Sequence, residues 1–572
     1  MPVRPPFNSR PLLAGLAATV LVALGACSAA KPEAPAADNA VPTLSDQTAE
    51  HPPLQEHLAA APLAKRAALS RETSPYSAYA LMPMPADAWP AGYRDANREQ
   101  YQKLADNPVH AVAETPVSTF SIDVDTGSYA NVRRLLNGGQ LPPPDAVRLE
   151  ELVNYFPYAY PLPKGDVPFG VHTELAVTPW NPHSRLLRIA IKASDLRVEA
   201  LPAANLVFLV DVSGSMDRRE GLPMVQSTLK LLVEQLRAQD RVSLVVYAGS
   251  SSVALEPTAG SEKAKIRAAI DQLTAGGSTA GESGIQLAYQ QAQRGFIKGG
   301  INRILLATDG DFNVGISDFD SLKQLAADKR KTGISLTTLG FGTDNYNEQL
   351  MEQLADAGDG NYAYIDTLRE ARKVLVDQLS STLATVASDV KIQVEFNPAQ
   401  VSEYRLLGYE NRALKREDFS NDKVDAGEIG AGHTVTALYE VVPVGSKGWL
   451  EPLRYQPAAK AAKQDGELAW LRIRYKTPGQ GISQLLEQPV HAADVRALSQ
   501  ASEDLRFAAA VAAFAQQLTG ATYTGRFSLA DSAELARTAK GEDRFGLRSE
   551  FVQLVELAQS LHTSADRERR AD

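Results

Sequence analysis

The chain has 572 residues, of which 44% are hydrophobic, 22% charged and 7% aromatic. That composition is typical of a globular protein, and the length is too great for one core and favours three or four domains. The formal net charge is −10, and becomes −12 without residues 1–27, which hold two arginines and no acid. An acidic protein without a lysine- and arginine-rich run is repelled by phosphate backbones, which excludes nucleic acid as an expected partner.

The first 27 residues have the pattern of a secretory signal. Arg4 and Arg10 precede the apolar stretch PLLAGLAATVLVALGA, which is too short to span a bilayer comfortably. The stretch runs into LGAC, and Cys27 is the only cysteine of the chain. Leucine three positions before, then small residues and cysteine, resembles the lipobox of bacterial lipoproteins, in which the cysteine is acylated and becomes the mature N-terminus. The alternative is an ordinary signal peptide with an incidental cysteine.

The lipobox resemblance implies a protein held at the bacterial cell envelope by a lipid on Cys27. No other stretch is long and apolar enough to span a bilayer, so we expect an anchored protein rather than a threaded one. Ser28 stands where inner-membrane retention would favour aspartate, and the expected location is therefore the outer membrane, facing the periplasm. With its only thiol lipidated, the mature protein would have no disulfide, thiolate metal site or cysteine nucleophile.

Residues 28–107 are rich in alanine and proline, as in KPEAPAADNAVP, and offer few β-branched or aromatic residues for a core. We expect a tether, whose ~80 residues would have an r.m.s. reach of about 50 Å if all were flexible.

Residues 108–202 contain two expected helices followed by two expected strands. The first helix carries Val132, Leu135 and Leu136 and stops at Asn137-Gly138-Gly139. Asp145 is expected to cap the second helix. The segments 171–177 and 187–191 alternate apolar and polar residues, which predicts two half-buried strands.

Residues 203–386 have a different pattern. Buried-type strands (LVFLV, RVSLVVYA, NRILLATD and ISLTTLGFG) alternate with helical segments such as VQSTLKLLVEQLRAQ. This alternation predicts an α/β domain with a doubly wound, mainly parallel sheet that helices cover on both faces.

Residues 387–572 return to alternating strands, as in VKIQVEFN, HTVTALYEVV and LAWLRIRYK, and end in about 70 helical residues. A lone hairpin at 170–200 would be marginal in water, and the strands after 390 also need a partner sheet. We therefore expect residues 170–200 to pair or pack with the strands after 390 in one β-sandwich, into which the α/β domain is inserted. Two linkers, near Leu201–Asn205 and Ala387–Val390, would join the two parts.

Small oxygen-bearing side chains stand where several strands of the α/β domain end. Asp211, Ser213 and Ser215 follow the first strand, Asp309 follows a later one in LLATDGDFN, and Thr279 lies between them in the glycine-rich loop LTAGGSTAGESGI. Ligands of open parallel sheets bind beyond the carboxyl ends of the strands, so we expect these side chains to meet at one edge. Hydroxyl and carboxylate oxygens are hard donors that suit Mg²⁺, Mn²⁺ or Ca²⁺ rather than Zn²⁺. The alternative is that Asp211 and Ser213 only cap a helix and Asp309 only makes a turn.

Asp-x-Ser-x-Ser, a threonine in a glycine-rich loop and Thr-Asp-Gly, in this order, resemble the von Willebrand factor A domain. In that family these positions form a metal-ion-dependent adhesion site. The resemblance implies that Mg²⁺ is held, directly or through water, by Asp211, Ser213, Ser215, Thr279 and Asp309. It also implies that an Asp or Glu carboxylate of a partner protein completes the coordination. With the block STFSIDVDTGSYANVRRLLNGGQLPPPDAVRLEELVNYF and the C-terminal region, most of the mature chain is similar to bacterial von Willebrand A-domain lipoproteins.

Three functions remain open at this point. The first is a non-enzymatic, metal-dependent protein-binding module for adhesion or assembly at the envelope. The second is a metal-dependent hydrolase, but the sequence shows no general base beside the metal and no nucleophile–base pair, so we expect no enzyme. The third is a structural scaffold of an envelope complex. STLK at 227–230 with KTG at 331–333, and DVDTG at 123–127, are set aside as coincidental or as a capped turn.

Overall fold

The computed structural model describes residues 99–571 apart from 123–124, 166, 279–280, 311–318, 344–345, 452 and 455–465. Cys27, the signal segment, most of the expected tether and Thr279 lie outside the described residues.

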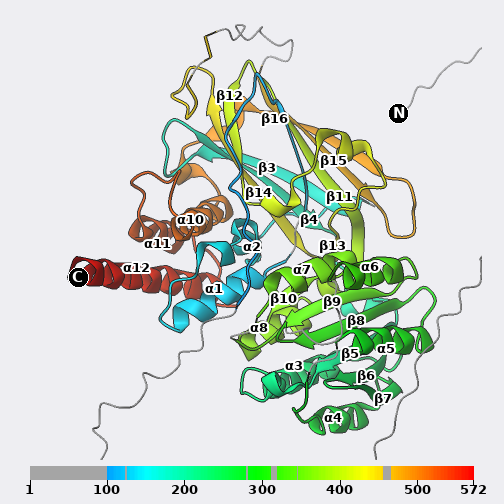
Figure 1. The fold of residues 1–572 in the computed structure, drawn as a ribbon. Helices are drawn as coiled ribbons and strands as arrows, with labels where there is room; N and C mark the ends of the chain where they lie inside the picture. The colour runs from blue at the N-terminus through cyan, green and yellow to red at the C-terminus, as the bar shows by residue number, and fades with distance from the viewer. Residues whose placement is uncertain are drawn as a thin grey trace, which may run out of the picture. The chain divides into compact units, whose positions relative to one another are not determined.

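The α/β domain is built on a sheet with the strand order β10-β9-β8-β5-β6-β7 (Figure 1). Every neighbouring pair is parallel except β6 and β7. The prediction of a doubly wound, mainly parallel sheet is confirmed. The strands are β5 (Ala204–Asp211), β6 (Arg241–Tyr247), β7 (Ser251–Ala259), β8 (Ile301–Thr308), β9 (Ser335–Gly340) and β10 (Tyr362–Tyr364).

Helices cover both faces of this sheet because β5 is apolar on both sides. Phe208 belongs to a core that also contains residues of α3 (Leu222–Gln235), α4 (Lys263–Asp271), α8 (Leu368–Arg372) and α9 (Leu379–Leu383). Leu209, on the opposite face, belongs to a second core with residues of α5 (Gly281–Arg294), α6 (Phe319–Arg330) and α7 (Glu348–Ala357). A π-helix, Lys373–Asp377, joins α8 to α9.

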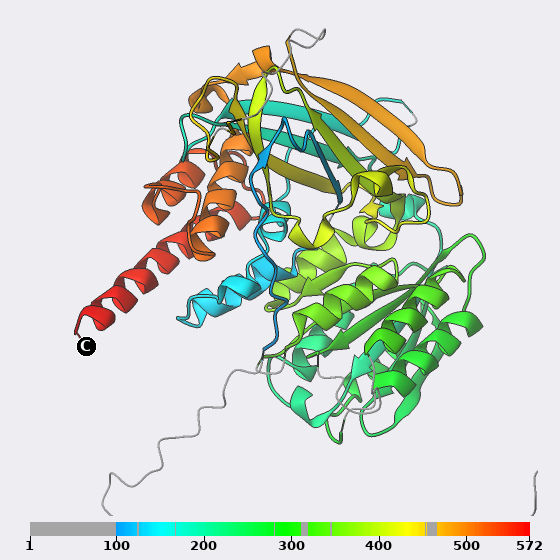
Figure 2. The same ribbon diagram turned by 45° about the horizontal axis from the view of Figure 1, so that its top comes forward.

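Two further sheets form a β-sandwich (Figure 2). The first has the order β1 (His110–Ala111), β12 (Val401–Leu407), β14 (Thr434–Pro443), β4 (Arg185–Ala193), β3 (Phe169–Val177) and β17 (Val495–Arg496). The second has the order β13 (Ile429–Gly430), β11 (Thr385–Phe396), β15 (Glu467–Lys476) and β16 (Gln484–His491), and β2 (Val117–Ser121) also pairs with β11. Residues from both sheets share one core, in which Ile191 packs with Ile392 and Ile473.

The α/β domain is inserted into this sandwich. β4, before the insertion, pairs antiparallel with β14, after it, so that Ile189 lies opposite Ala437 and Ile191 opposite Val435. The hypothesis that residues 170–200 pair with strands after 390 is confirmed. Leu201 and Ala384, on the two connections to the inserted domain, pack together with Ala431. The second connection precedes the expected segment Ala387–Val390, which lies inside β11.

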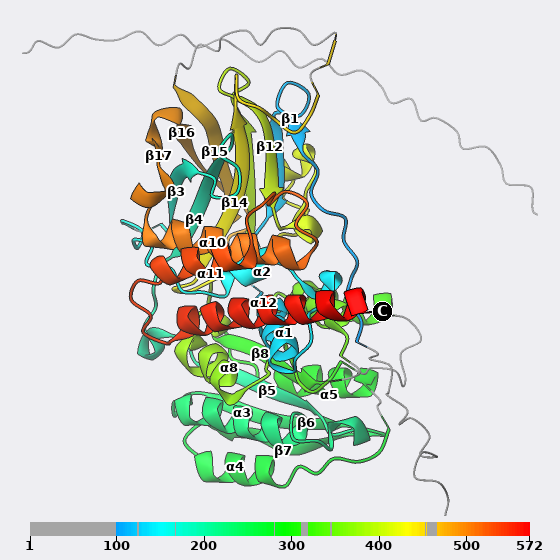
Figure 3. The ribbon, with the colours of Figure 1, turned by 90° about the vertical axis from the view of Figure 1, so that its left-hand side faces the viewer.

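Helices cover the outer face of the six-stranded sheet of the sandwich, which contains β4 and β14. Within this helical layer α12 lies beside α1 and α11 (Figure 3). Phe156, Phe507, Phe514 and Phe551 form an aromatic group within this layer. The helices are α1 (Gly127–Asn137), α2 (Leu149–Asn154), α10 (Glu503–Leu518), α11 (Leu529–Thr538) and α12 (Leu547–Ala571). Short 3-10 helices lie at Pro144–Ala146, Val198–Ala200, Gly214–Met216, Glu410–Arg412, Arg416–Ser420, Ala492–Asp494 and Leu498–Gln500.

Two expectations for the N-terminal part are wrong. Asp145 does not cap α2, because it lies in a 3-10 helix that ends at Ala146. Val147 and Arg148, between this helix and α2, are extended, and the Arg148 N–H donates to Ser128 Oγ at 2.9 Å. The ordered chain also begins before residue 108. The Gln100 N–H donates to Tyr346 O at 2.9 Å, and Tyr101 packs against the core of the α/β domain.

Candidate functional site

Four of the five expected metal ligands lie at one edge of the parallel sheet. Asp211 is the last residue of β5, and Ser213 and Ser215 lie at the start of the 3-10 helix that follows. Asp309 comes directly after β8. Because β5 and β8 are parallel neighbours, their carboxyl ends meet at the same edge.

The two serine hydroxyls and the Asp211 carboxylate form one hydrogen-bonded group. Ser213 Oγ lies 3.0 Å from Ser215 Oγ, and the Ser213 N–H donates to Asp211 Oδ1 at 2.9 Å. The hydroxyl of Thr308 donates to Asp211 Oδ2 at 2.9 Å. Asp211, Ser213 and Asp309 are buried, whereas Ser215 is half-buried.

Two residues that were not among the expected site residues also bind the Asp211 carboxylate: Thr308, and Tyr247, whose hydroxyl donates to Asp211 Oδ2 at 3.4 Å. Thr308 stands next to Asp309, so its signal was present in LLATDG. Tyr247 closes β6, the other neighbour of β5, and the strand order was needed to place it. Both hydroxyls donate to the same oxygen, Asp211 Oδ2, and so orient the carboxylate.

The glycine-rich loop before Thr279 lies against the serine loop. The Gly276 N–H donates to Val212 O at 2.8 Å, and the Gly214 N–H donates to Gly277 O at 3.0 Å. Gly277 has φ +90°, a backbone conformation that favours glycine. The structure therefore brings the loop to the expected edge, while Thr279 itself lies outside the described residues.

The electrostatics of the group favour a bound cation. The pKa of Asp211 is raised to about 6: burial is the main cause, the hydrogen bonds from Ser213 and Thr308 oppose the rise, and the negative charge of Asp309 adds to it. Two carboxyl groups in a buried place repel each other when both are ionised, and a cation between them removes that repulsion.

The donor set fits a hard divalent ion. Mg²⁺ takes oxygen ligands at about 2.1 Å in an octahedron, which places adjacent ligands about 3.0 Å apart. The two serine oxygens have this separation. Within residues 99–571, gaps apart, no three His, Cys, Asp or Glu side chains cluster in a way that could hold a metal ion. A cation at this edge would therefore use hydroxyl oxygens as well as carboxylate oxygens. These hard donors suit Mg²⁺ better than Zn²⁺.

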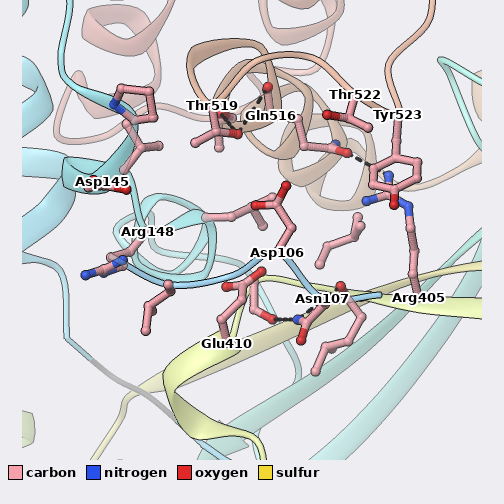
Figure 4. Close-up of a pocket in the computed structure, with 18 residues that line it drawn as sticks. Asp106, Asn107, Asp145, Arg148, Arg405, Glu410, Gln516, Thr519, Thr522 and Tyr523 are labelled. Atoms are coloured by element: carbon pink, nitrogen blue, oxygen red, sulfur yellow. Dashed lines mark hydrogen bonds between the residues drawn. The ribbon is translucent and has the colours of Figure 1, made fainter. Parts of the chain in front are cut away.

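A small polar cavity lies elsewhere, between α2, α10 and β12 (Figure 4). It encloses about 120 Å³, below the size of ordinary small-molecule sites. Its two arginines already bind protein atoms: Arg405 donates to Gln516 Oε1 at 2.6 Å and to Glu440 Oε2 at 2.7 Å, and Arg148 donates to Gln102 O at 2.7 Å. We assign this cavity to the packing of the three elements.

Comparison with known proteins places the chain in a family. Residues 205–378 match the family described as von Willebrand factor type A domain, residues 95–188 the one described as von Willebrand factor, and residues 381–561 the one described as Uncharacterized protein YfbK, C-terminal. The protein YfbK of Escherichia coli K12 is 54% identical over 468 residues, which are 80% of this chain and 81% of YfbK. The chain belongs to the YfbK family. The expectation of a von Willebrand factor A domain is confirmed.

The other relatives match a smaller share of the chain. The protein sll0103 of Synechocystis is 34% identical over 188 residues, which are 33% of this chain and 43% of that protein. Among solved structures, a von Willebrand factor type A protein from Catenulispora acidiphila covers 68% of this chain and 91% of its own, with 16% identity and a TM-score of 0.39. In the described part of the chain, the helices are all too short or too polar to cross a bilayer.

Proposed function

We propose that this protein is a metal-ion-dependent protein-binding module of the bacterial cell envelope, which serves adhesion or assembly and not catalysis. A von Willebrand factor A domain is typical of a protein-interaction module. The observation that carries the metal dependence is the 3.0 Å separation of the Ser213 and Ser215 hydroxyls beside the buried Asp211 and Asp309.

In this proposal Ser213 and Ser215 bind the cation directly, and Asp211, Asp309 and Thr279 bind it directly or through water. The cation is Mg²⁺, with Mn²⁺ or Ca²⁺ as alternatives. Thr308 and Tyr247 hold the Asp211 carboxylate in place through their hydroxyls. The cation supplies a Lewis-acidic position at the rim of the sheet, where an Asp or Glu carboxylate of a partner protein binds.

The metal site is tested by titrating the full-length protein with Mn²⁺ or Mg²⁺ in a calorimeter. We expect one divalent-ion site in the wild type and none in the double variant Ser213→Ala/Ser215→Ala, because the variant lacks the two direct ligands. The fold should survive, since neither hydroxyl supports the core. The matched control is Ser227→Ala/Ser560→Ala, whose exposed hydroxyls donate only to helix carbonyls. Unchanged metal affinity in the first variant would contradict the assignment.

The partner is tested by affinity capture from envelope extracts with and without Mg²⁺. We expect a captured protein that requires both Mg²⁺ and an intact site, and that is absent when Asp211→Ala is the bait. A partner retained equally by Asp211→Ala and without Mg²⁺ would show that binding does not pass through this edge.

Anchoring is tested with Cys27→Ser. We expect an uncleaved precursor or a soluble periplasmic species, because stable anchoring needs more than one acyl chain and the variant has none. Membrane fractionation followed by mass spectrometry of the mature N-terminus measures this directly. Wild-type fractionation of the variant would rule out the lipid on Cys27.

A further inference from the structure

A second, larger cavity lies where three parts of the fold meet, and we call it the junction cavity. It encloses about 370 Å³, within the usual range of small-molecule sites. One wall comes from the last helices of the A domain (369–381). Another comes from the six-stranded sheet of the sandwich and its loops (192–195 and 431–434), and the third from the helical layer (154–158 and 545–547). The junction cavity is separate from the serine group at the end of β5.

The charge of the junction cavity is opposite to that of the whole protein. Four cationic side chains and two carboxylates line it, although the chain carries a net charge of −10. The cations are Lys192, Arg369, Arg372 and Lys373, and the acids are Asp195 and Asp377.

Two of these cations keep capacity for a ligand. Lys192 Nζ donates to Gly432 O at 2.5 Å, which uses one of the three N–H donors of its ammonium group. Arg372 is 64% exposed, and the acid paired with it, Asp377, lies 3.9 Å away. Lys373, in contrast, is bound to Glu370 at 3.1 Å.

The arrangement brings like charges together at one buried imidazole. Burial and, to a smaller extent, the positive charges of Lys373 and Lys192 together lower the pKa of His433 to about 4. The two ammonium groups come from different parts of the fold, one from the π-helix and one from β4. His433 Nε2 is buried, and no described residue forms a hydrogen bond with it. An anion in the cavity would offset the positive charge that the two lysines place at this imidazole.

The remaining wall is apolar. Phe156, Pro157, Tyr158, Phe545 and Leu547 line it. A mixed wall of this kind favours a ligand with an anionic group at one end and an apolar group at the other. We infer that the junction cavity binds a small organic anion whose carboxylate or phosphate lies between Lys192 and Arg372 and whose apolar part lies against Phe156 and Phe545.

Four probes test this inference by calorimetry on the full-length protein: phenyl phosphate, benzoate, inorganic phosphate and benzyl alcohol. The buffer is passed over a chelating resin, so that no carboxylate can bind through a metal ion at Asp211. We expect phenyl phosphate or benzoate to bind with 1:1 stoichiometry, inorganic phosphate to bind more weakly, and benzyl alcohol not to bind. The stronger of the two aromatic anions tells whether the natural ligand carries a phosphate or a carboxylate.

Variants locate the binding. Lys192→Gln and Arg372→Gln should each lower the affinity about tenfold or more, because each removes a charge-assisted hydrogen bond. Arg372 is exposed, so its variant should fold even if Lys192→Gln does not. The control Lys331→Gln removes an equally exposed cation from the same domain, outside the cavity, and should leave the affinity unchanged. If no anion binds at concentrations up to about 10 mM, the dissociation constant is too high for a specific site, and the inference is overturned. Equal weakening by Lys331→Gln, or equal binding of benzyl alcohol, would also overturn it.

Discussion

Glu348 is a buried carboxyl group without a hydrogen-bonded cation. It is the first residue of α7 and is fully buried, and its closest ion-pair partner, Arg148 Nη2, lies 3.6 Å away. Burial raises the pKa of Glu348 from its ordinary value of 4.5 to about 8; Arg148 opposes the rise, and the negative charges of Glu352 and Glu150 add to it. At neutral pH the folded protein therefore holds Glu348 protonated.

The sign of the pH dependence follows from this shift. Between pH 4.5 and 8 the folded protein holds a proton that the unfolded chain has lost, so this group's contribution to stability falls as the pH rises. Glu348→Gln removes this titratable group, and we expect the free energy of unfolding of the variant to gain about 3–4 kcal/mol relative to the wild type between pH 5 and pH 8. Urea denaturation at the two pH values measures the gain. Glu282→Gln, on the exposed first turn of α5, is the control, and a Glu348→Gln gain no larger than that of the control would contradict the prediction.

At the scale of elements, one arginine ties three helices together. Arg133 on α1 is 2% exposed and donates to Asp366 Oδ2 at 2.7 Å and Glu370 Oε2 at 2.8 Å, before and within α8. It also reaches Glu550 on α12 at 3.2 Å. Burial alone would raise the pKa of Glu370, but Lys373, Arg133 and the Tyr155 hydroxyl lower it to about 2. The Glu370 carboxylate is thus ionised and depends on its cations.

Arg133→Met should destabilise the protein by about 3–5 kcal/mol, because it leaves the buried Asp366 without its main partner and removes one of the two cations that pair with Glu370. The measurement is the free energy of unfolding in urea at pH 7. The control is Arg537→Met, which breaks the solvent-screened surface pairs with Glu534 and Glu556 and should cost far less stability. Equal losses in the two variants would show that the buried network contributes no more than a surface pair.

The strands and helices with strong periodicity could be predicted from the sequence, and those set by neighbours could not. The apolar run Leu206–Val210 predicts a strand buried on both faces, and this prediction depends only on the residues of the run itself. β7 has an exposed, mixed pattern and is defined only by its pairing with β6. Residues 99–107 are ordered through contacts with Tyr346 and other distant residues, which composition does not reveal.

The candidate site was predictable to a similar extent. The order of Asp211, Ser213, Ser215 and Asp309 along parallel strands was enough to bring them to one edge. The hydroxyl of Tyr247 could not be assigned, because its role depends on β6 being a direct neighbour of β5. The junction cavity was also unpredictable, since its three walls come from segments up to about 390 residues apart in the chain, a long-range packing that periodicity does not encode.

At the scale of the whole described molecule, the A domain should be removable. Its two connections lie together, with Leu201 and Ala384 packed on Ala431. Replacing residues 202–383 by a short glycine–serine linker should leave a folded sandwich of lower stability, because Ala130 on α1 loses the A-domain residues that it packs against. Circular dichroism and a cooperative thermal transition measure this outcome. A chain without a transition would show that the sandwich depends on the inserted domain.

The pairing of β4 with β14 also sets a delay during synthesis. Ala437, the partner of Ile189, is synthesised about 250 residues later. At a synthesis rate of about 5–20 residues per second, the interval between the two residues is roughly 12–50 s. Through this interval the apolar edge of the β3–β4 hairpin has no partner, and such edges promote aggregation. The A domain is complete before β14 emerges, and once folded it holds its two ends together. Closing the same loop as an unfolded chain would cost about 4–5 kcal/mol of entropy. The inserted domain therefore shortens the search of a newly made sandwich for its last central strand.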